Sequence, residues 1–384
     1  MKKYIYLDNA ATTALDAEVL SAMLPYLTEH YGNPSSSYAL GREAKAAIEA
    51  NRKSVALALG VSPLNIYFTS GGTESNNTAI ACAVNELGCK HIITSSIEHH
   101  AVLNTVKRYC ERSAIDCTIL TPSTQGFLNL QELEDKLIEK NKEGIKCLVS
   151  LMHANNEIGV LLDIEKVGNL CEKYNAIFHS DCVQTIGHLE MDLKKYKLHF
   201  ASASGHKFHG PKGTGILYAS ERVKLSPLII GGGQERQSRA GTENVAGIVG
   251  FGKALELSMR NHPEESTYIR SLNELMRNAL SQSIPDVSFN SPIDGLYTVL
   301  SVNFLNAMPG SLLLAHLDRA GICASGGSAC SSGSDGGSHV INALGLSSSG
   351  STVRFSFSKL TSATDVDEAV RALSAIFQST VPVA

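Results

Sequence analysis

The feature that most constrains this chain is a lysine set in a turn of small residues. Residues 202–213 read Ser-Ala-Ser-Gly-His-Lys-Phe-His-Gly-Pro-Lys-Gly, with Lys207 near the centre. Apolar runs at 198–201 and 215–218 predict a β-strand on each side of this turn. Poor hydration between buried strands favours the neutral form of an amine, which is the form that Schiff-base chemistry needs. A solvated surface lysine beside a Gly-Pro turn is the alternative interpretation.

Strand and helix patterns alternate through the first part of the chain. The predicted strands are 66–70, 91–94, 118–120, 147–152 and 176–180. The predicted helices are 16–28, 44–59, 78–84, 101–109 and 164–174. This alternation predicts an α/β domain with a parallel sheet and helices on both faces. Ligands of such sheets bind at the carboxyl ends of the strands, so we expect the polar residues found there to converge: Gly72, Thr73, His99, Asn155, Asp181 and Lys207.

One of these strand ends has the composition of an anion site. The strand at 66–70 runs directly into Gly71, Gly72 and Thr73, and an apolar helix pattern follows. Glycines allow close approach of the backbone, and the free N–H groups of a helix start favour phosphate. The Gly-Lys-Ser/Thr ending of a P-loop is absent. A plain tight turn is the alternative interpretation.

The composition changes after about residue 257. A charged helical stretch at 260–278 is followed by a mixture of strand and helix patterns, typical of an α+β domain. We therefore predict a large domain at 14–256 and a smaller one formed by 1–13 and 257–384. The smaller domain includes a Gly/Ser-rich segment at 324–338 that resembles a flexible linker.

Cys330 lies in the middle of that Gly/Ser-rich segment. A buried structural cysteine is not expected in such a loop, which favours a functional thiol over an incidental one. The chain has nine cysteines, an odd number with scattered spacing and no CxxC pair, which disfavours a disulfide framework or a cysteine-rich zinc site.

Other classes of function find little support. The net charge is −4 without a basic block, so neither nucleic acid nor an anionic membrane is an implied partner. The start of the chain does not resemble a signal peptide and no stretch resembles a membrane span, so we expect a cytoplasmic location. His179-x-Asp181-Cys182 and His206-x-x-His209 offer metal donors, but neither spacing is a standard zinc motif, so we expect no metal. No G-x-S-x-G elbow supports a serine hydrolase.

Nearly the whole chain resembles the cysteine desulfurases of the NifS/IscS type, which are class-V aminotransferases within fold type I of the pyridoxal phosphate (PLP) enzymes. The most specific segments are residues 7–13, 69–77, 155–159, 204–207 and 327–330. The resemblance implies an α/β, fold type I, PLP-dependent transferase. Its large PLP-binding domain would hold a mostly parallel sheet flanked by helices, and its smaller α+β domain would carry the catalytic cysteine loop.

The resemblance also implies a role for each residue around the cofactor ring. Lys207 would form the Schiff base with PLP and later move the Cα proton of the substrate. Asp181 would pair with the pyridine nitrogen and keep it protonated. Gln184 would hydrogen-bond the phenolic oxygen, Val183 would pack on one face of the ring, and His99 would stack on the other face as acid or base.

Further roles concern the phosphate, the substrate and a second subunit. Thr242 would reach the phosphate of the neighbouring subunit, which requires a homodimer. Arg354 would form a bidentate pair with the substrate carboxylate, assisted by Asn155. The phosphate would otherwise be bound by Gly72, Thr73, Ser204 and His206.

The implied reaction is the removal of sulfur from L-cysteine. The Cys330 thiolate would attack the substrate sulfur, leaving a persulfide on Cys330 and releasing L-alanine. An acceptor protein of unknown identity would take the sulfur onward to iron–sulfur cluster assembly, tRNA thiolation or another thiolation pathway. A selenocysteine lyase or an aminotransferase on the same scaffold is an alternative, and a non-enzymatic binding subunit is another. Lys207, Asp181 and His99 are all present, which argues against lost catalysis.

Overall fold

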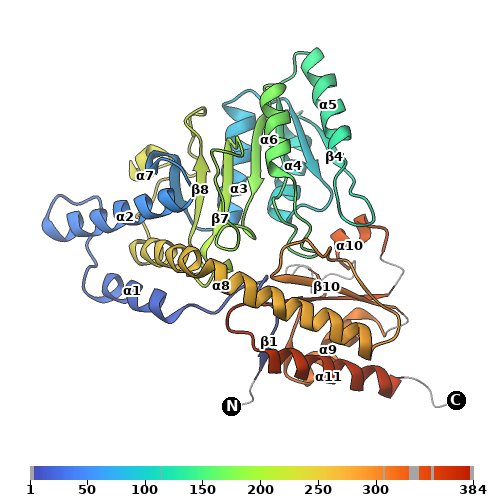
Figure 1. Ribbon diagram of the computed structural model, residues 1–384. Coiled ribbons are helices and arrows are strands. Elements are labelled where there is room, and N and C mark those ends of the chain that lie inside the picture. The colour runs from blue at the N-terminus through green and yellow to red at the C-terminus, as the bar shows by residue number, and fades with distance from the viewer. Residues whose placement is uncertain (1–3, 114, 306–307, 328–336, 347–349, 381–384) are drawn as a thin grey trace.

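The computed structural model describes residues 4–113, 115–305, 308–327, 337–346 and 350–380 (Figure 1). Its largest element is a seven-stranded sheet. In sheet order the strands are β2 (Ile66–Thr69), β8 (Gly215–Ala219), β7 (Phe200–Ser204), β6 (Ile177–Asp181), β5 (Cys147–Ser150), β3 (His91–Ser95) and β4 (Asp116–Leu120).

Five neighbouring strands of this sheet, from β7 to β4, are parallel, and β8 is antiparallel to both β7 and β2. The predicted mostly parallel sheet is therefore confirmed. The exception has a simple cause, because residues 205–214 between β7 and β8 are too few for a crossover and must turn the chain back. Lys207 lies in this return, within a short 3-10 helix (η2, Gly205–Lys207).

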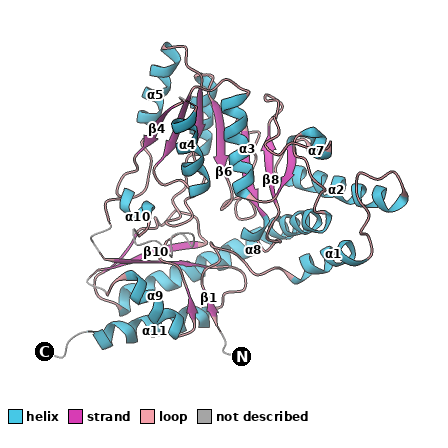
Figure 2. Cartoon of the chain, turned by 180° about the vertical axis from the view of Figure 1, so that it is seen from behind, coloured by secondary structure: helices cyan, strands magenta, loops and turns pink. Residues whose placement is uncertain are grey.

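Helices cover both faces of the sheet. Ile92 and Leu148 belong to one core cluster and the adjacent Ile93 and Val149 to another, as expected when successive side chains point to opposite faces. The first cluster includes α3 (Gly72–Asn85) and α4 (His100–Arg112), seen in front of the sheet in Figure 2. The second cluster involves α1 (Ala17–Thr28), α2 (Ala39–Ala58), α5 (Leu130–Lys142), α6 (Ile164–Lys173) and the first half of α8 (Val245–Ser283).

A smaller α+β part lies at the other end of the molecule, where Figure 1 places both termini. Its antiparallel sheet has the order β12-β10-β9, and the N-terminal strand β1 (Ile5–Tyr6) pairs in parallel with β11 (Ile322–Cys323). Ile5 and Leu7 are buried in its hydrophobic core. The other elements are β9 (Val287–Phe289), β10 (Val299–Phe304), α9 (Gly310–Arg319), α10 (His339–Ala343), β12 (Ser351–Ser356) and α11 (Ala363–Thr380). The exact domain boundaries stay a prediction.

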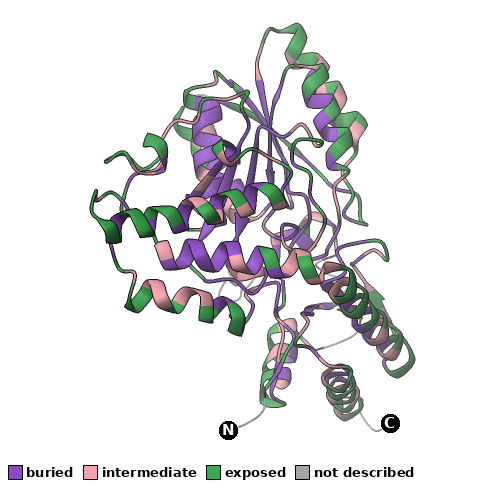
Figure 3. Cartoon of the chain, turned by 60° about the vertical axis from the view of Figure 1, so that its left-hand side comes forward, coloured by how far each residue is buried: buried purple, intermediate pink, exposed green. Residues whose placement is uncertain are grey.

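Helix α8 joins the two parts. The sequence pattern predicts one helix at 245–259 and a second helical stretch at 260–278, whereas the structure has a single helix that includes Pro263. The pattern changes because the first half is buried on most sides while the second half buries only one face, as the colours of Figure 3 show. Across the described ranges, no helix combines the length and apolar character needed to cross a membrane.

Other differences from the sequence-based expectations are local. Strand β7 begins two residues later than expected and continues to Ser204, and α3 begins at Gly72 rather than at 78. The sequence patterns did not suggest α5, β9 or β11, nor the short turns η1 (Pro63–Asn65) and α7 (Gln234–Gln237). Helix α5 was missed because only Leu133 and Leu137 are buried on an otherwise charged segment.

Candidate active site

The carboxyl ends of the parallel strands surround a cavity of about 250 Å³. Most of the residues selected from the sequence line it, although they come from elements far apart in the chain. They are Gly72, Thr73, His99, Asp181, Val183, Gln184, Ser204, His206, Lys207 and Arg354. Asn76, Met152 and Asn156 also lie on its wall.

Lys207 enters the cavity from η2. Its amine donates hydrogen bonds to the backbone carbonyl oxygens of Ala10 at 2.6 Å and Ala11 at 2.9 Å. The Gln184 amide donates to the same Ala10 oxygen at 3.0 Å. The N-terminal segment therefore holds both side chains at the cavity wall, even though it is 174 residues from Gln184 and 197 from Lys207 in sequence.

Asp181 ends strand β6 and is almost fully buried. The Asn76 amide donates to its Oδ2 at 2.6 Å, and the Val183 backbone N–H donates to its Oδ1 at 3.0 Å. These two bonds fix the orientation of a carboxylate that lines the cavity. The Oδ1 atom of Asn76 is buried without a hydrogen-bond partner, so this side of the site holds an unused acceptor.

His99 is the N-cap of α4. Its Nδ1 accepts a hydrogen bond from the Ala101 backbone N–H at 3.1 Å, which assigns the remaining proton of the neutral ring to Nε2. Burial lowers the pKa of His99, and the opposing attraction of Asp181 is weaker. The structure therefore presents a neutral imidazole whose Nε2–H is available as a donor.

The predicted anion site lies between β2 and α3. Gly71 has φ = +150°, which favours glycine, and a Cβ added at Gly72 would come within 2.5 Å of the Val183 Cγ2 atom. The first turn of α3, whose N–H groups have no partner within the helix, lines the same cavity as Ser204 and His206. Burial lowers the pKa of His206 to about 4, so its ring is neutral at pH 7 and contributes hydrogen bonding rather than charge.

Arg354 reaches the cavity from β12 and is fully buried. Its Nη1 donates to the Asn156 carbonyl oxygen at 2.8 Å, and its Nη2 donates to the Asp8 Oδ1 at 2.6 Å. The Nε atom is buried without a partner. A guanidinium held in this way retains a donor for a carboxylate.

Three selected residues are not among those that line the cavity. The Asn155 Oδ1 accepts from the backbone of Glu157 and Ile158, and its amide donates to the Ile97 carbonyl oxygen, so it holds the loop that presents Asn156. Thr242 is exposed and lines a separate cavity of about 210 Å³. Cys330 lies outside the described residues. The roles expected for these three stay predictions.

The candidate metal donors are engaged elsewhere. The two ring nitrogens of His179 contact the hydroxyl groups of Ser150 at 2.8 Å and Ser202 at 3.2 Å. His209 contacts the Ala14 carbonyl oxygen through Nδ1. Within the part of the chain that the structure describes, no three His, Cys, Asp or Glu side chains are grouped to hold a metal ion.

Asn76 and Asp8 lie within specific sequence segments, but the sequence by itself indicates no role for either. In the structure Asn76 orients Asp181, and Asp8 pairs with Arg354. The signal was present, since Asp8 and Asn76 lie in two of the five most specific segments, 7–13 and 69–77. What was missing was the identity of their partners, which lie more than 100 residues away.

The family model for class-V aminotransferases matches residues 5–369. The chain belongs to this family. A relative from Clostridium botulinum (strain Hall), named cysteine desulfurase IscS, is 40% identical, covering 98% of this chain and 95% of its own length. A Methanosarcina thermophila relative of the same name is 43% identical, covering 98% of this chain and 92% of its own.

Solved structures agree with this assignment. A NifS-like protein superimposes with a TM-score of 0.90 at 36% identity, covering 98% of this chain and 100% of that one. SspA, solved in complex with cysteine, superimposes with a TM-score of 0.80 at 34% identity and covers 92% of this chain and 98% of that one. The expected α/β fold and family are thereby confirmed.

Proposed function

We propose that this class-V aminotransferase is a cysteine desulfurase that converts L-cysteine to L-alanine and leaves the sulfur as a persulfide on Cys330. The observation that carries the proposal is the cavity that brings Lys207, Asp181 and Arg354 together. These supply an amine, a buried carboxylate and a carboxylate-binding guanidinium. The names of the relatives at 40–43% identity over nearly the full length point to the same reaction.

Pyridoxal 5′-phosphate is the cofactor that these residues fit. The absent side chain at Gly72 lets Val183 pack against the start of α3, and the N–H groups of α3 suit the phosphate of a bound group. Asp181 is oriented to pair with a pyridine nitrogen. When bound, PLP supplies an aldehyde that joins an amine and a ring that accepts electrons. The proposed ligands are Gly72, Thr73, Asp181, Val183, Gln184, Ser204, His206 and Lys207, with Thr242 from a neighbouring subunit.

Residues of the chain itself would bind the substrate, transfer protons and accept the sulfur. Arg354 binds the substrate carboxylate, with Asn155 supporting the adjacent loop. Lys207 would carry the Cα proton of the substrate on its Nζ atom, and His99, whose Nδ1 accepts from the Ala101 N–H, would hold a proton on Nε2. The Cys330 thiolate then attacks the cysteine sulfur: an S–S bond forms, the Cβ–S bond breaks, and the electron pair left on Cβ takes a proton to complete alanine.

A second copy of the chain is part of the proposal. Thr242 is outside the cavity of its own subunit, so a phosphate contact from it requires another subunit. Helix α1 offers an apolar face for association, since Leu20, Leu24 and Leu27 are about half exposed on one side of the helix. We also propose a cytoplasmic location, which suits a thiol reaction, and an acceptor protein for the sulfur.

The test uses the purified full-length chain. We expect a PLP absorption band near the edge of the visible range and formation of alanine from L-cysteine. Lys207→Ala should lose the band, and Cys330→Ala should keep the band but lose alanine and persulfide formation. A colourless protein that takes up no added PLP would overturn the proposal. Alanine release by Cys330→Ala at the wild-type rate would overturn the role of Cys330 and point to another desulfurising or lyase chemistry on the same scaffold, whereas loss of the amino group with the sulfur retained would point to an aminotransferase.

A further inference from the structure

A carboxylate stands beside the proposed phosphate site. Glu74 is the third residue of α3, directly after Gly72 and Thr73. It lines a cavity of about 370 Å³ whose wall also includes four residues proposed to bind phosphate: Gly72, Thr73, Ser204 and His206. Lys212 lines the same wall and would attract a phosphate. An ionised Glu74 would still repel a phosphate dianion at that position unless a cation paired with it directly.

Arg239 supplies that compensation. Its Nε donates to the Glu74 Oε1 at 2.9 Å and its Nη2 donates to Oε2 at 3.1 Å, a bidentate pair. Oε2 also accepts from the Ser70 backbone N–H at 2.8 Å. Burial pushes the pKa of Glu74 upward, but the hydrogen bonds from Arg239 and Ser70 outweigh it and hold the pKa below its usual value. Glu74 is therefore charged and dependent on Arg239.

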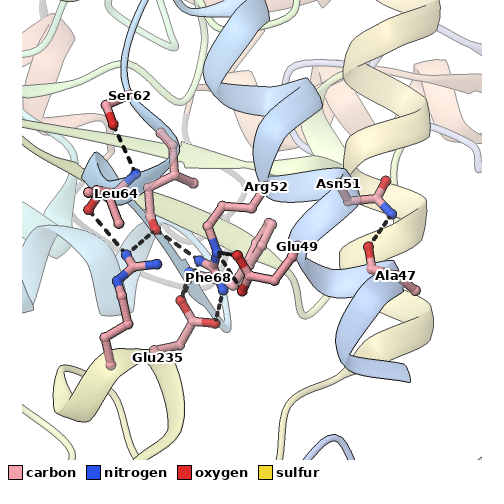
Figure 4. Close-up of polar contacts among 10 residues, drawn as sticks. Ala47, Glu49, Asn51, Arg52, Ser62, Leu64, Phe68 and Glu235 are labelled. Carbon is pink, nitrogen blue, oxygen red and sulfur yellow. Dashed lines mark hydrogen bonds and ion pairs between the residues drawn. The ribbon is translucent and has the colours of Figure 1, made fainter. Parts of the chain in front are cut away.

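The loop that carries Arg239 is itself held against α2 and β2 (Figure 4). The Glu235 carboxylate receives two 2.7 Å bonds from the Arg52 guanidinium and a third from the Phe68 backbone N–H at 2.9 Å. Both side chains are almost fully buried. The Arg52 guanidinium also stacks over the Phe68 ring, 4.9 Å from its centroid. A buried, fully bonded pair of this kind holds its segment in one position.

The backbone of this loop needs such a clamp. Glu235, Arg236 and Gln237 have φ values of +45°, +56° and +67°. Three successive non-glycine residues in the left-handed region carry strain of about 1 kcal/mol or more each, which persists only where the surroundings impose it. The strained turn at 235–237 is thus held in place, and it positions Arg239 two residues later to pair with Glu74.

We propose that Arg239 is a positioning residue for the cofactor phosphate, acting through Glu74. It neutralises the carboxylate beside the phosphate cradle and fixes the position of that carboxylate, which itself ties Ser70 at the end of β2 to the start of α3. The inference rests on the proposed function, because it takes the phosphate of PLP as the ligand of the cradle. It goes beyond that function by giving a role to a residue that does not line the PLP cavity.

The test compares two probes, PLP and pyridoxal, which lacks the phosphate. Dissociation constants are measured from the absorption of bound cofactor on full-length protein. Arg239→Met should raise the dissociation constant for PLP about tenfold or more, since an unpaired carboxylate then faces the dianion. The constant for pyridoxal should change by less than about twofold. A purely structural loss would weaken both probes alike.

A second variant keeps the inference falsifiable if the first is unstable. Glu74→Gln removes the charge while retaining an acceptor for the Ser70 N–H, so the double variant Glu74→Gln/Arg239→Met should recover most of the PLP affinity. Arg277→Met is the matched control, because Arg277 is a half-buried arginine over the Phe289 ring in the smaller part of the molecule. It should leave both constants unchanged.

The outcomes separate the two proposals. Wild-type protein that binds neither probe would overturn the proposed function. Wild-type protein that binds PLP, together with an Arg239→Met variant of equal PLP affinity, would overturn only this inference. A double variant as weak toward PLP as Arg239→Met alone would also overturn it, because relief of charge repulsion would then have no effect.

Discussion

At the scale of single residues, the site depends on Gly72 having no side chain. Gly72 starts α3 beneath the proposed phosphate, and a Cβ there would lie 2.5 Å from the Val183 Cγ2 atom. No side-chain contact is shorter than about 3 Å without displacement of a neighbour, so Gly72 and Val183 form a pair in which one must remain small.

Gly72→Ala should therefore displace Val183 toward the proposed cofactor and raise the dissociation constant for PLP about tenfold. Val183→Ala in the same chain removes the clashing methyl groups and should restore part of the lost affinity. Absorbance titration with PLP measures both effects. Equal affinity of Gly72→Ala and wild type would show that the two residues do not share this space when PLP is bound.

Arg354 leads to a prediction about the substrate. Arg354→Lys keeps the positive charge but loses the planar fork, so the KM for L-cysteine should rise about tenfold or more with a smaller change in kcat. Steady-state alanine formation measures both constants. Arg277→Lys is the control for a general effect of arginine loss. An unchanged KM would remove Arg354 from the proposed carboxylate site.

At the scale of secondary-structure elements, β6 shows how a buried strand sets a pH dependence. His179 is fully buried in β6 between hydroxyl groups of β5 and β7, and burial lowers its pKa to about 4. The unfolded chain binds this proton near pH 6.5 whereas the folded chain does not, so stability falls as pH drops through this window.

Between pH 7 and pH 5, His179 alone should reduce the free energy of unfolding by about 2 kcal/mol. His179→Gln cannot titrate, so its loss of stability over the same interval should be smaller by about that amount. Urea denaturation of both proteins at the two pH values measures the difference. An identical loss in the variant would show that His179 stays accessible to protons.

Helix α8 contributes to hydrophobic cores in both parts of the molecule. Its first half buries Ile248, Phe251 and Leu255 in the core of the large sheet, and its second half buries Ile269 and Leu272 in the smaller core. One helix thus takes part in two cores, and its two hydrophobic patterns belong to two partners. Hydrophobic periodicity alone therefore predicts two helices where the backbone forms one.

At the scale of the whole molecule, the proposed homodimer can be tested through α1. Leu24→Asp/Leu27→Asp places two charges on the apolar face of the helix and should convert a particle of twice 41.0 kDa into one of 41.0 kDa in sedimentation equilibrium. The variant should also bind PLP less tightly, because it would lose the contact proposed for Thr242.

Ile293→Asp provides the control, since Ile293 is also strongly exposed but lies in the smaller part. It should leave the mass of the particle unchanged. A wild-type protein that sediments as a monomer yet binds PLP would contradict both the dimer and the role proposed for Thr242. A dimeric Leu24→Asp/Leu27→Asp variant would place the interface elsewhere.

Much of this arrangement was open to prediction from the chain alone. The alternation of strand and helix patterns indicated the large sheet, and the polar residues after the strands indicated where Asp181, His99 and Lys207 would meet. These inferences succeed because strand period, helix period and turn chemistry act between near neighbours, and because parallel strands end at one edge of a sheet.

The tertiary structure decided which distant residues became partners. Asp8 lies 346 residues from Arg354, and Ala10 lies 197 residues from Lys207, yet each pair is joined by a hydrogen bond of 2.6 Å. Arg239 and Glu74 are likewise 165 residues apart. Such pairs depend on the order of the strands and on how the chain returns to them, and no local pattern of hydrophobicity carries that information.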